Sequence, residues 1–388
     1  MRRSLVFLTA LAMCGATIGF SGSVLAYTCS TSFHCYGTAN WNSAPSNEGN
    51  YTYLYSQCLN GPNTTTNFAD EEIWEGTDNS TTGNYWVETG LSYGGINHIA
   101  KGGPFWFWAR NRPSDNTYAE FYVGPASNNA SYLAEIVYAG NDQWWVYENT
   151  THVGTSNSNP PYSRFMATGE ELAGNYNVIG ESSDMSWFDL SGHVHTDWSS
   201  GSSHPSIQNT YPPAQANWIS NYNALTYYAN CGVAAPASAP TTSTRVRAVS
   251  PATVRAEAKV QSASVAVRKG TVEISSTALA TLRVLANTMV VTSEGMGVST
   301  GQAVLTTRQQ AATVTAGDMV NSDQGVYLVQ LHGQFTAVDA SVPPGQVAPT
   351  GQYLTFAVDS LTGDVLDWTV GNHYSDLAAL GPVAALSL

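Results

Sequence analysis

Charged side chains are scarce in this chain of 388 residues, where Asp, Glu, Lys and Arg together make up 11% of the sequence. Surface helices draw on Lys, Glu and Arg, so this shortage argues against an all-α protein, whereas the abundant Gly, Ser, Thr, Asn, Trp and Tyr suit strands and turns. Basic residues are the rarer charge, with 14 Lys and Arg against 28 Asp and Glu and a net charge of -14. Because such a surface repels a phosphate backbone, we expect no nucleic acid partner.

Long apolar runs are missing after residue 26, so we expect no membrane span in the mature protein. The first residues differ: Met1-Arg2-Arg3 is positively charged, residues 5–20 are almost entirely apolar, and Val24-Leu25-Ala26 offers small residues for cleavage. This pattern predicts a signal peptide over residues 1–26 and a secreted protein. A retained membrane anchor is the alternative, and a lipoprotein acylated at Cys14 is disfavoured by the large Met13 before it.

Cysteines are few, and none forms a C-x-x-C pair, which argues against a structural zinc site. Removal of residues 1–26 would leave Cys29, Cys35, Cys58 and Cys231, an even number in an oxidising compartment. We therefore predict two disulfides. Their connectivity stays open, although Cys231 must pair with one of the three early cysteines if all four are bonded.

Composition divides the chain in two, as its length beyond the usual ~100 to 200 residues of one domain suggests. Residues 232–251 are rich in Ala, Pro, Ser and Thr and read as a linker. Residues 27–231 carry 4 basic and 18 acidic side chains, whereas residues 232–388 carry 8 and 10. We predict one domain over 27–231 and a smaller accessory domain over 252–388.

The first domain alternates short apolar runs with turn clusters, which predicts an antiparallel sandwich or barrel without persuasive helices. Strands are expected at residues 84–91, 104–109, 132–138, 143–147 and 185–190, with hairpin turns at 139–142 and 149–151. The second domain reads as a small α+β unit, with a helix over 276–289 and strands over 325–331 and 353–358. Residues 358–366 resemble the hairpin of PepSY-type domains, although an ordinary β-turn explains them as well.

Several familiar catalytic motifs are absent: there is no P-loop, dinucleotide fingerprint, H-E-x-x-H or calcium loop. Residues 90–94 satisfy G-x-S-x-G, but a nucleophile elbow requires a following helix, and none is expected there. His193, His195 and Asp197 would share one face of a strand and could ligate a metal, yet no second ligand cluster accompanies them. We expect neither a metal nor a cofactor.

Carboxylates set among aromatic residues remain as candidates. Alternation places Trp86 and Glu88 on the same face of a strand, where low dielectric raises a carboxyl pKa and suits it to proton transfer. Glu170 and Glu171 are adjacent, so on a strand they face opposite ways and only one can join Glu88.

The order of these motifs resembles the neprosin-type glutamic peptidases and, more loosely, the eqolisin peptidases. The resemblance covers about residues 70–201 and rests on Trp86-Val87-Glu88-Thr89-Gly90, Phe105-Trp106-Phe107-Trp108, Trp144-Trp145-Val146-Tyr147, Gly169-Glu170-Glu171-Leu172 and His195-Thr196. It implies an antiparallel concanavalin-like β-sandwich, with Glu88 at the first catalytic position and Glu171 at the second. Glu170 stands where neprosins have glycine and Thr168 where they have tryptophan, so Glu170 remains the fallback.

The resemblance implies a secreted, acid-active endopeptidase that cleaves polypeptides. Glu171 would activate the attacking water and the protonated Glu88 would stabilise the oxyanion and protonate the leaving amine. Substrate-binding candidates are Trp86, Trp106, Trp108 and Trp145. Two alternatives use the same residue types: a non-catalytic module that binds carbohydrate or cell-wall polysaccharide through an aromatic platform, and a β-sandwich glycoside hydrolase.

Overall fold

The computed structural model describes residues 28–230 except 63, 65, 66, 96–102, 202 and 211, and then residues 247–261 and 269–388, with the side chains of 259–261 left out. The predicted signal peptide, Cys231 and most of the predicted linker lie outside the described residues. Among the helices that the structure describes, none has the length and apolar character needed to cross a bilayer.

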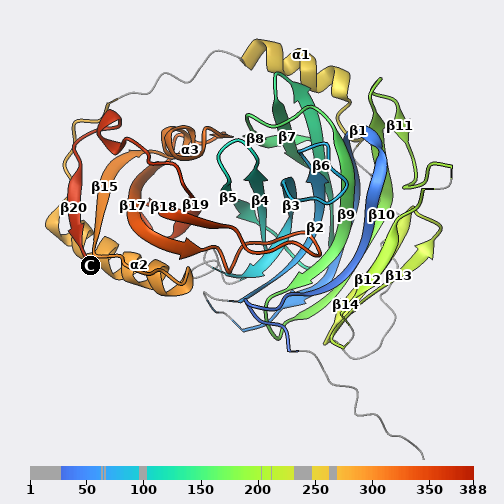
Figure 1. Ribbon diagram of the computed structural model, residues 1–388, viewed down its shortest axis with the longest axis horizontal. Coiled ribbons are helices and arrows are strands. Elements are labelled where there is room, and N and C mark those ends of the chain that lie inside the picture. The colour runs from blue at the N-terminus through green and yellow to red at the C-terminus, as the bar shows by residue number, and fades with distance from the viewer. Residues whose placement is uncertain are drawn as a thin grey trace, which may run out of the picture.

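Two antiparallel sheets packed face to face form the core of the protein (Figure 1). The first sheet contains, in spatial order, β12 (Ser206–Asn209), the first part of β1 (Cys35–Asn60), β9 (Ser163–Leu172), β2 (Phe68–Gly76), β3 (Trp86–Gly94), β4 (Phe105–Arg112) and β5 (Thr117–Pro125). The second contains β16 (Met319–Val320), β8 (Thr151–Ser156), β7 (Gln143–Glu148), β6 (Ala130–Gly140), the second part of β1, β10 (Asn177–Asp189), β14 (Ala224–Ala229) and β13 (Ala214–Ser220), with the short β11 (Val194–His195) beside β10. The predicted all-β sandwich is confirmed.

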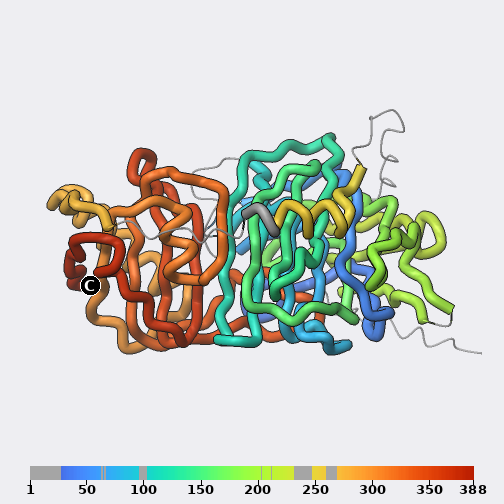
Figure 2. Tube along the Cα trace, turned by 90° about the horizontal axis from the view of Figure 1, so that it is seen from above, coloured from blue at the N-terminus to red at the C-terminus, as the bar shows by residue number. Residues whose placement is uncertain are grey.

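The C-terminal strands extend the first sheet rather than forming a detached one. β5 pairs with β19 (Val365–Gly371), which is followed by β18 (Thr350–Asp359), β17 (Gly325–Thr336), β15 (Thr300–Thr307) and β20 (Ala384–Ser387). Figure 2 shows the C-terminal part beside the sandwich along the long axis of the molecule. Because the two parts share a sheet, the division into residues 27–231 and 252–388 stays a prediction about independent folding units.

Helices are few in the described part of the chain and pack against the sheets. α1 (Pro251–Gln261) packs Val254 and Ala258 on Val137 and Trp145 of the second sheet. α2 (Ser276–Thr292) begins at the predicted residue, because the Ser275 side chain caps the N–H of Ala278. α3 (Arg308–Ala316) and the single turn η2 (Leu377–Ala379) complete the described helices.

The two largest apolar cores follow from this arrangement. One lies between the two sheets, and the other lies between the opposite, concave face of the first sheet and the C-terminal strands. The concave-face core includes Trp74, Trp86, Phe107, Val342 and Leu354. All nine residues of β2 are buried because both faces of this strand are covered.

The short-range predictions hold well. Each of the five strands expected before residue 231 lies on a strand of the structure, and the helix expected over 276–289 is α2. The two predicted hairpin turns use left-handed backbone at Asn141-Asp142 and Asn149-Thr150, as two-residue turns require. One of the two predicted disulfides is present, between Cys29 and Cys35, whereas Cys231 lies outside the described residues.

Candidate active site

Three carboxylates meet on the concave face of the first sheet. Alternation along β2 sends Asp70 and Glu72 to this face and Glu71 to the other. Asp70 pairs across the ladder with Glu171 of β9, and carboxylate oxygens of Asp70, Glu72 and Glu171 lie within 4.8 Å of one another. We call these three residues the acidic trio.

The acidic trio is shielded from water, with exposed fractions of 2% for Asp70 and 0% for Glu72 and Glu171. Burial raises the pKa of Glu72 well above its ordinary value, and the charges of Glu88, Asp70 and Glu171 raise it further. Burial also raises the pKa of Asp70, a hydrogen bond from Ser92 opposes this, and the charge of Glu171 adds to it. Burial therefore favours the carboxylic acid form of Glu72 and Asp70.

A segment from the C-terminal part covers the acidic trio. Residues 337–349, which we call the strap, connect β17 to β18 and reach the concave face beside β2, as the orange trace in Figure 1 shows. The Oγ atom of Ser341 lies 2.8 Å from Oε1 of Glu72 and 2.7 Å from Oε2 of Glu171. The N–H of Val342 donates to the same Oε2 of Glu171 at 2.9 Å.

These distances determine where one proton lies. A serine hydroxyl has a single hydrogen, so it donates to only one of two carboxylates within reach. Glu171 also accepts from Val342 N–H and lies within hydrogen-bond distance of the Tyr36 hydroxyl, and donors that converge on a carboxylate favour its charged form. Donation from Ser341 to Glu171 leaves its oxygen to accept from Glu72, whose raised pKa favours the carboxylic acid form. Glu72 and Glu171 thus lie on either side of one hydroxyl oxygen.

Tyr36 and His34 complete the surroundings of Glu171. The Tyr36 hydroxyl lies 3.2 Å from Oε1 of Glu171 and 3.1 Å from the carbonyl oxygen of Val342, so its single hydrogen is shared between these two acceptors. Burial, followed by the charge of Glu171, raises the pKa of Tyr36, so this hydroxyl stays a donor. Nδ1 of His34 is hydrogen-bonded to Oε1 of Glu171. A cavity of about 400 Å³ lined by His34, Tyr36, Val338 and Val342 lies beside them.

Glu88 lies on the same face but apart from the acidic trio. Its partner across the ladder is Trp74 of β2, and within the described residues it makes no hydrogen bond to Glu72 or Glu171. Burial raises its pKa well above the ordinary value, and the charges of Glu171, Asp70 and Glu120 add to this. Glu88 thus shares the electrostatic environment of the acidic trio, and its catalytic role stays a prediction.

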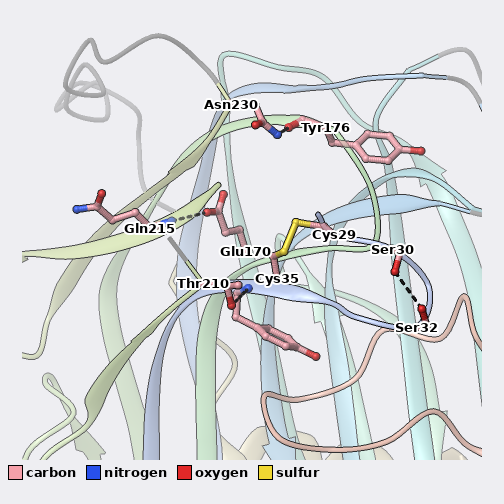
Figure 3. The surroundings of a disulfide bond; sticks show 10 residues. Cys29, Ser30, Ser32, Cys35, Glu170, Tyr176, Thr210, Gln215 and Asn230 are labelled. Carbon is pink, nitrogen blue, oxygen red and sulfur yellow. Dashed lines mark hydrogen bonds between the residues drawn. A yellow bond between two sulfur atoms is a disulfide. The ribbon is translucent and has the colours of Figure 1, made fainter. Parts of the chain in front are cut away.

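Glu170 points away from the acidic trio, because adjacent residues on a strand face opposite sides and Glu171 faces the trio. It lies between the two sheets, where Oε1 accepts the N–H of Gln215 at 3.2 Å (Figure 3). Gly169 has a left-handed φ of 142°, and a Cβ atom there would lie 2.2 Å from the carbonyl oxygen of Gly37. The glycine lets β9 approach β1 closely, which brings Tyr36 to Glu171.

The tryptophans of the sequence prediction do not line one surface. Trp86 lies on the concave face with Glu88, whereas Trp106 and Trp108 pack between the sheets. Trp145 is covered by α1. Ten of the eleven tryptophans are buried and Trp218 is half-buried, so the described residues form no exposed tryptophan platform of the kind that the carbohydrate-binding alternative needs.

The G-x-S-x-G match and the group of His193, His195 and Asp197 lie in surroundings that do not suggest catalysis. Ser92 of the G-x-S-x-G match lies within β3, without the strand-to-helix turn of a nucleophile elbow. His193 and His195 both contact Asp189, at 3.3 and 3.2 Å, while Asp197 binds Ser199. In the described part of the chain, the acidic trio is the group of carboxylates close enough to hold a cation. The Val342 N–H that points at Glu171 opposes such a use.

Sequence reasoning missed Asp70, Glu72, Tyr36 and Ser341. The run Asp70-Glu71-Glu72-Ile73-Trp74 carries a signal, since alternation would have placed two acids and a tryptophan on one face. The sequence around Ser341 carries no such local signal, because the contact between Ser341 and Glu171 spans 170 residues.

Comparisons with known proteins give a limited likeness. No family model matches the chain, and no curated protein matches it. The chain is similar to solved structures of a scytalido-glutamic peptidase with a peptide-based transition state analog (12% identity, TM-score 0.32) and of SCP-B, a member of the eqolisin family, with the tripeptide Ala-Ile-His (11% identity, TM-score 0.30). Each match covers 53% of this chain and 99% of the other. The neprosin-type resemblance stays a prediction, and a function has to be argued from the residues of this chain.

Proposed function

We propose that this protein is a secreted, acid-active endopeptidase in which Glu171 and Glu72 activate water against a peptide bond. The observation that carries the proposal is the Ser341 hydroxyl oxygen held within hydrogen-bond distance of both Glu171 and Glu72, beside a main-chain carbonyl within reach of the Tyr36 hydroxyl. The site thus contains two carboxyl groups to act as base and acid, a tyrosine hydroxyl to donate to a carbonyl oxygen, and a segment of main chain in the place of a substrate. These are the groups that peptide hydrolysis requires.

The Oγ atom of Ser341 stands in for the attacking water in this mechanism. Glu171 takes one proton from the water as its oxygen bonds to the carbonyl carbon, and Tyr36 donates a hydrogen bond to the developing oxyanion. Glu72 gives its proton to the leaving nitrogen as the C–N bond breaks. Glu171 then carries the proton and Glu72 the charge, and transfer of that proton back to Glu72 restores the starting state.

Substitution of either glutamate is the direct test. Denatured protein at pH 3 to 4 is the substrate, and the enzyme is the full chain together with a form in which the strap is replaced by Asn-Gly. Glu171→Gln and Glu72→Gln are expected to reduce hydrolysis about 10³-fold, because each removes a proton-transfer group while keeping the side-chain shape. Glu88→Gln is the matched control on the same face and is expected to change the rate less than about tenfold.

Three results would redirect the proposal. Loss of activity in Glu88→Gln with activity retained in Glu72→Gln would restore Glu88 as the acid. Loss of activity on adding a chelator would point to a cation on the acidic trio. Absence of hydrolysis in every form, together with binding of soluble polysaccharide, would favour the carbohydrate-binding alternative.

Removal of the Tyr36 hydroxyl tests its role as a hydrogen-bond donor to the carbonyl oxygen. Tyr36→Phe is expected to lower kcat about 10²-fold with little change in KM, because the hydrogen bond to the oxyanion strengthens only in the transition state. Steady-state kinetics on a fluorogenic peptide at pH 4 measures both constants. A rise in KM at constant kcat would instead assign Tyr36 to ground-state binding.

A further inference from the structure

We propose that the strap is a built-in peptide ligand that fills the active site and keeps the enzyme latent until the strap is displaced or cut. This inference rests on the proposed function for its effect on hydrolysis. The occupation of the site is independent of that function, because it follows from the contacts of Ser341 and Val342.

The strap is far longer than its connection requires. Thr336 of β17 and Thr350 of β18 are direct partners across the ladder, so a two-residue turn would join these strands. The chain instead inserts thirteen residues, 337–349, and buries the first seven of them. Loops normally stay at the surface because burial deprives their polar main chain of water. A buried insertion of this kind needs specific partners.

The partners of the strap are residues of the proposed active site. Val342 donates its N–H to Glu171 and accepts from Tyr36 at its carbonyl, while Ser341 bridges Glu171 and Glu72. Both polar main-chain groups of Val342 are therefore satisfied by the catalytic side chains rather than by a neighbouring strand. This is the pattern expected of a bound substrate.

Apolar contacts fix the strap on either side of these hydrogen bonds. Ala340 and Val342 belong to the concave-face core with Trp74, Trp86 and Phe107. The cleft therefore takes small and β-branched side chains around the reacting carbonyl, and we expect peptides with such residues to bind best.

The geometry also explains why the strap survives in its own active site. The carbonyl held by Tyr36 belongs to the Val342–Pro343 bond, and the place of the attacking water is filled by Ser341 Oγ. Without a water between Glu72 and Glu171, that bond is not attacked. The remainder of the strap emerges at the surface, where Val347 is 83% exposed, so a protease can reach it there.

Tethering makes the strap an effective inhibitor. A ligand held at both ends of a short loop has an effective concentration in the millimolar range or above, so a free peptide at micromolar concentration does not displace it. Cutting the loop or removing it should therefore expose a site that free peptides can enter.

The principal test replaces residues 337–349 with Asn-Gly in the full chain and uses two readouts. A fluorescent peptide with the sequence of residues 336–344 measures binding by anisotropy at pH 4, and a fluorogenic peptide measures hydrolysis. The strap-free variant is expected to bind the labelled peptide at least tenfold more tightly than the full chain and to hydrolyse substrate at least tenfold faster. The unlabelled strap peptide should inhibit it in trans.

A second form keeps the test decisive if the strap-free variant does not fold. A recognition sequence for a site-specific protease placed at residues 345–348 allows the folded protein to be nicked in the exposed part of the strap. Val347→Ser, at an exposed position of the same loop, is the matched control and should stay latent. Nicking is expected to raise peptide binding and hydrolysis in the same direction, although less than complete removal.

The two proposals fail in different ways. Binding without hydrolysis after removal or nicking supports the strap as a ligand and overturns the peptidase proposal. Equal hydrolysis by the full, nicked and strap-free chains overturns the latency and leaves the peptidase intact. Failure of every opened form to bind the strap peptide overturns the inference.

Discussion

Raising the pH from 4 to 8 is expected to lower the melting temperature of this protein by roughly 10 °C or more. Folding buries an unusual number of carboxyl groups, and burial raises their pKa above the ordinary values near 4. The carboxyl groups with a raised pKa are Glu48, Asp70, Glu71, Glu72, Glu75, Glu88, Glu135, Glu148, Glu170 and Asp339. The folded chain therefore holds protons at pH values where the unfolded chain has released them.

The sign of the effect follows from proton linkage. A carboxyl group whose folded pKa is raised contributes its full stabilisation below the unfolded pKa, near 4, and loses it as the pH rises toward the folded pKa. For Glu135 the pKa rises from 4.5 to about 8, mainly through burial, which corresponds to about 5 kcal/mol when both states have titrated. A typical domain has only ~5–15 kcal/mol of stability, so the loss between pH 4 and pH 8 is large.

Opposing groups are fewer. Burial lowers the pKa of His152 to about 4, so this side chain favours folding more as the pH rises from 4 to 6.5. The pKa of Asp115 and that of Asp189 are lowered as well, but these carboxyl groups titrate near and below pH 4 and change little between pH 4 and pH 8. One opposing group against ten leaves the balance on the side of greater stability in acid.

Thermal unfolding followed by circular dichroism at pH 4, 6 and 8 measures this prediction. Glu135→Gln is the matched control, because Glu135 lies on β6 and contacts Val249 rather than the acidic trio. This variant should retain its activity and show a smaller difference between pH 4 and pH 8. A melting temperature that stays constant or rises toward pH 8 would contradict the assignment of buried, protonated carboxyl groups.

The sequence was informative wherever the signal was local. Alternation of apolar and polar residues and the turn residues located strands and hairpins. Because Glu170 and Glu171 are adjacent on a strand, they face opposite sides of the sheet and only one can reach the site. Which strands become neighbours was beyond such reasoning. β2 and β9 are about 95 residues apart, yet their pairing places Glu72 beside Glu171. The residues around Glu72 contain no local pattern that identifies Glu171 as its neighbour.

Burial was harder still to predict. Trp145 was expected to reach a ligand, but α1, which begins more than 100 residues later, covers it. Ser341 reaches Glu171 only because the C-terminal strands continue the first sheet through β5 and β19 and bring the strap over the concave face. These are non-local contacts of the whole fold, whereas a single sequence reports mainly local preferences.

Asp318→Ala is expected to destabilise the protein by about 3–5 kcal/mol. Arg110 on β4 is fully buried, and its Nε donates to Oδ2 of Asp318 at 2.7 Å. Arg112 approaches the other carboxylate oxygen at 3.3 Å, and Asn157 N–H donates to it at 3.1 Å. Burial lowers the pKa of Arg110, and the charge of Asp318 is the main influence that opposes this. Loss of Asp318 would leave a buried guanidinium without its counter-charge, which is far more costly than loss of a surface ion pair.

Urea unfolding at pH 4 to 6 measures the effect, and the double variant Arg110→Met with Asp318→Leu is the control. Removing both charges should recover most of the stability, because an apolar pair of similar volume avoids the cost of burying ions. A loss below about 1 kcal/mol in Asp318→Ala would mean that water reaches Arg110 and that the pair is not buried in solution. Asp318 precedes β16, whose pairing with β8 joins the C-terminal part to the sandwich through residues outside the strap. Asp318→Ala should therefore weaken the attachment of the C-terminal part as a whole, whereas nicking the strap should open the active site while this attachment remains.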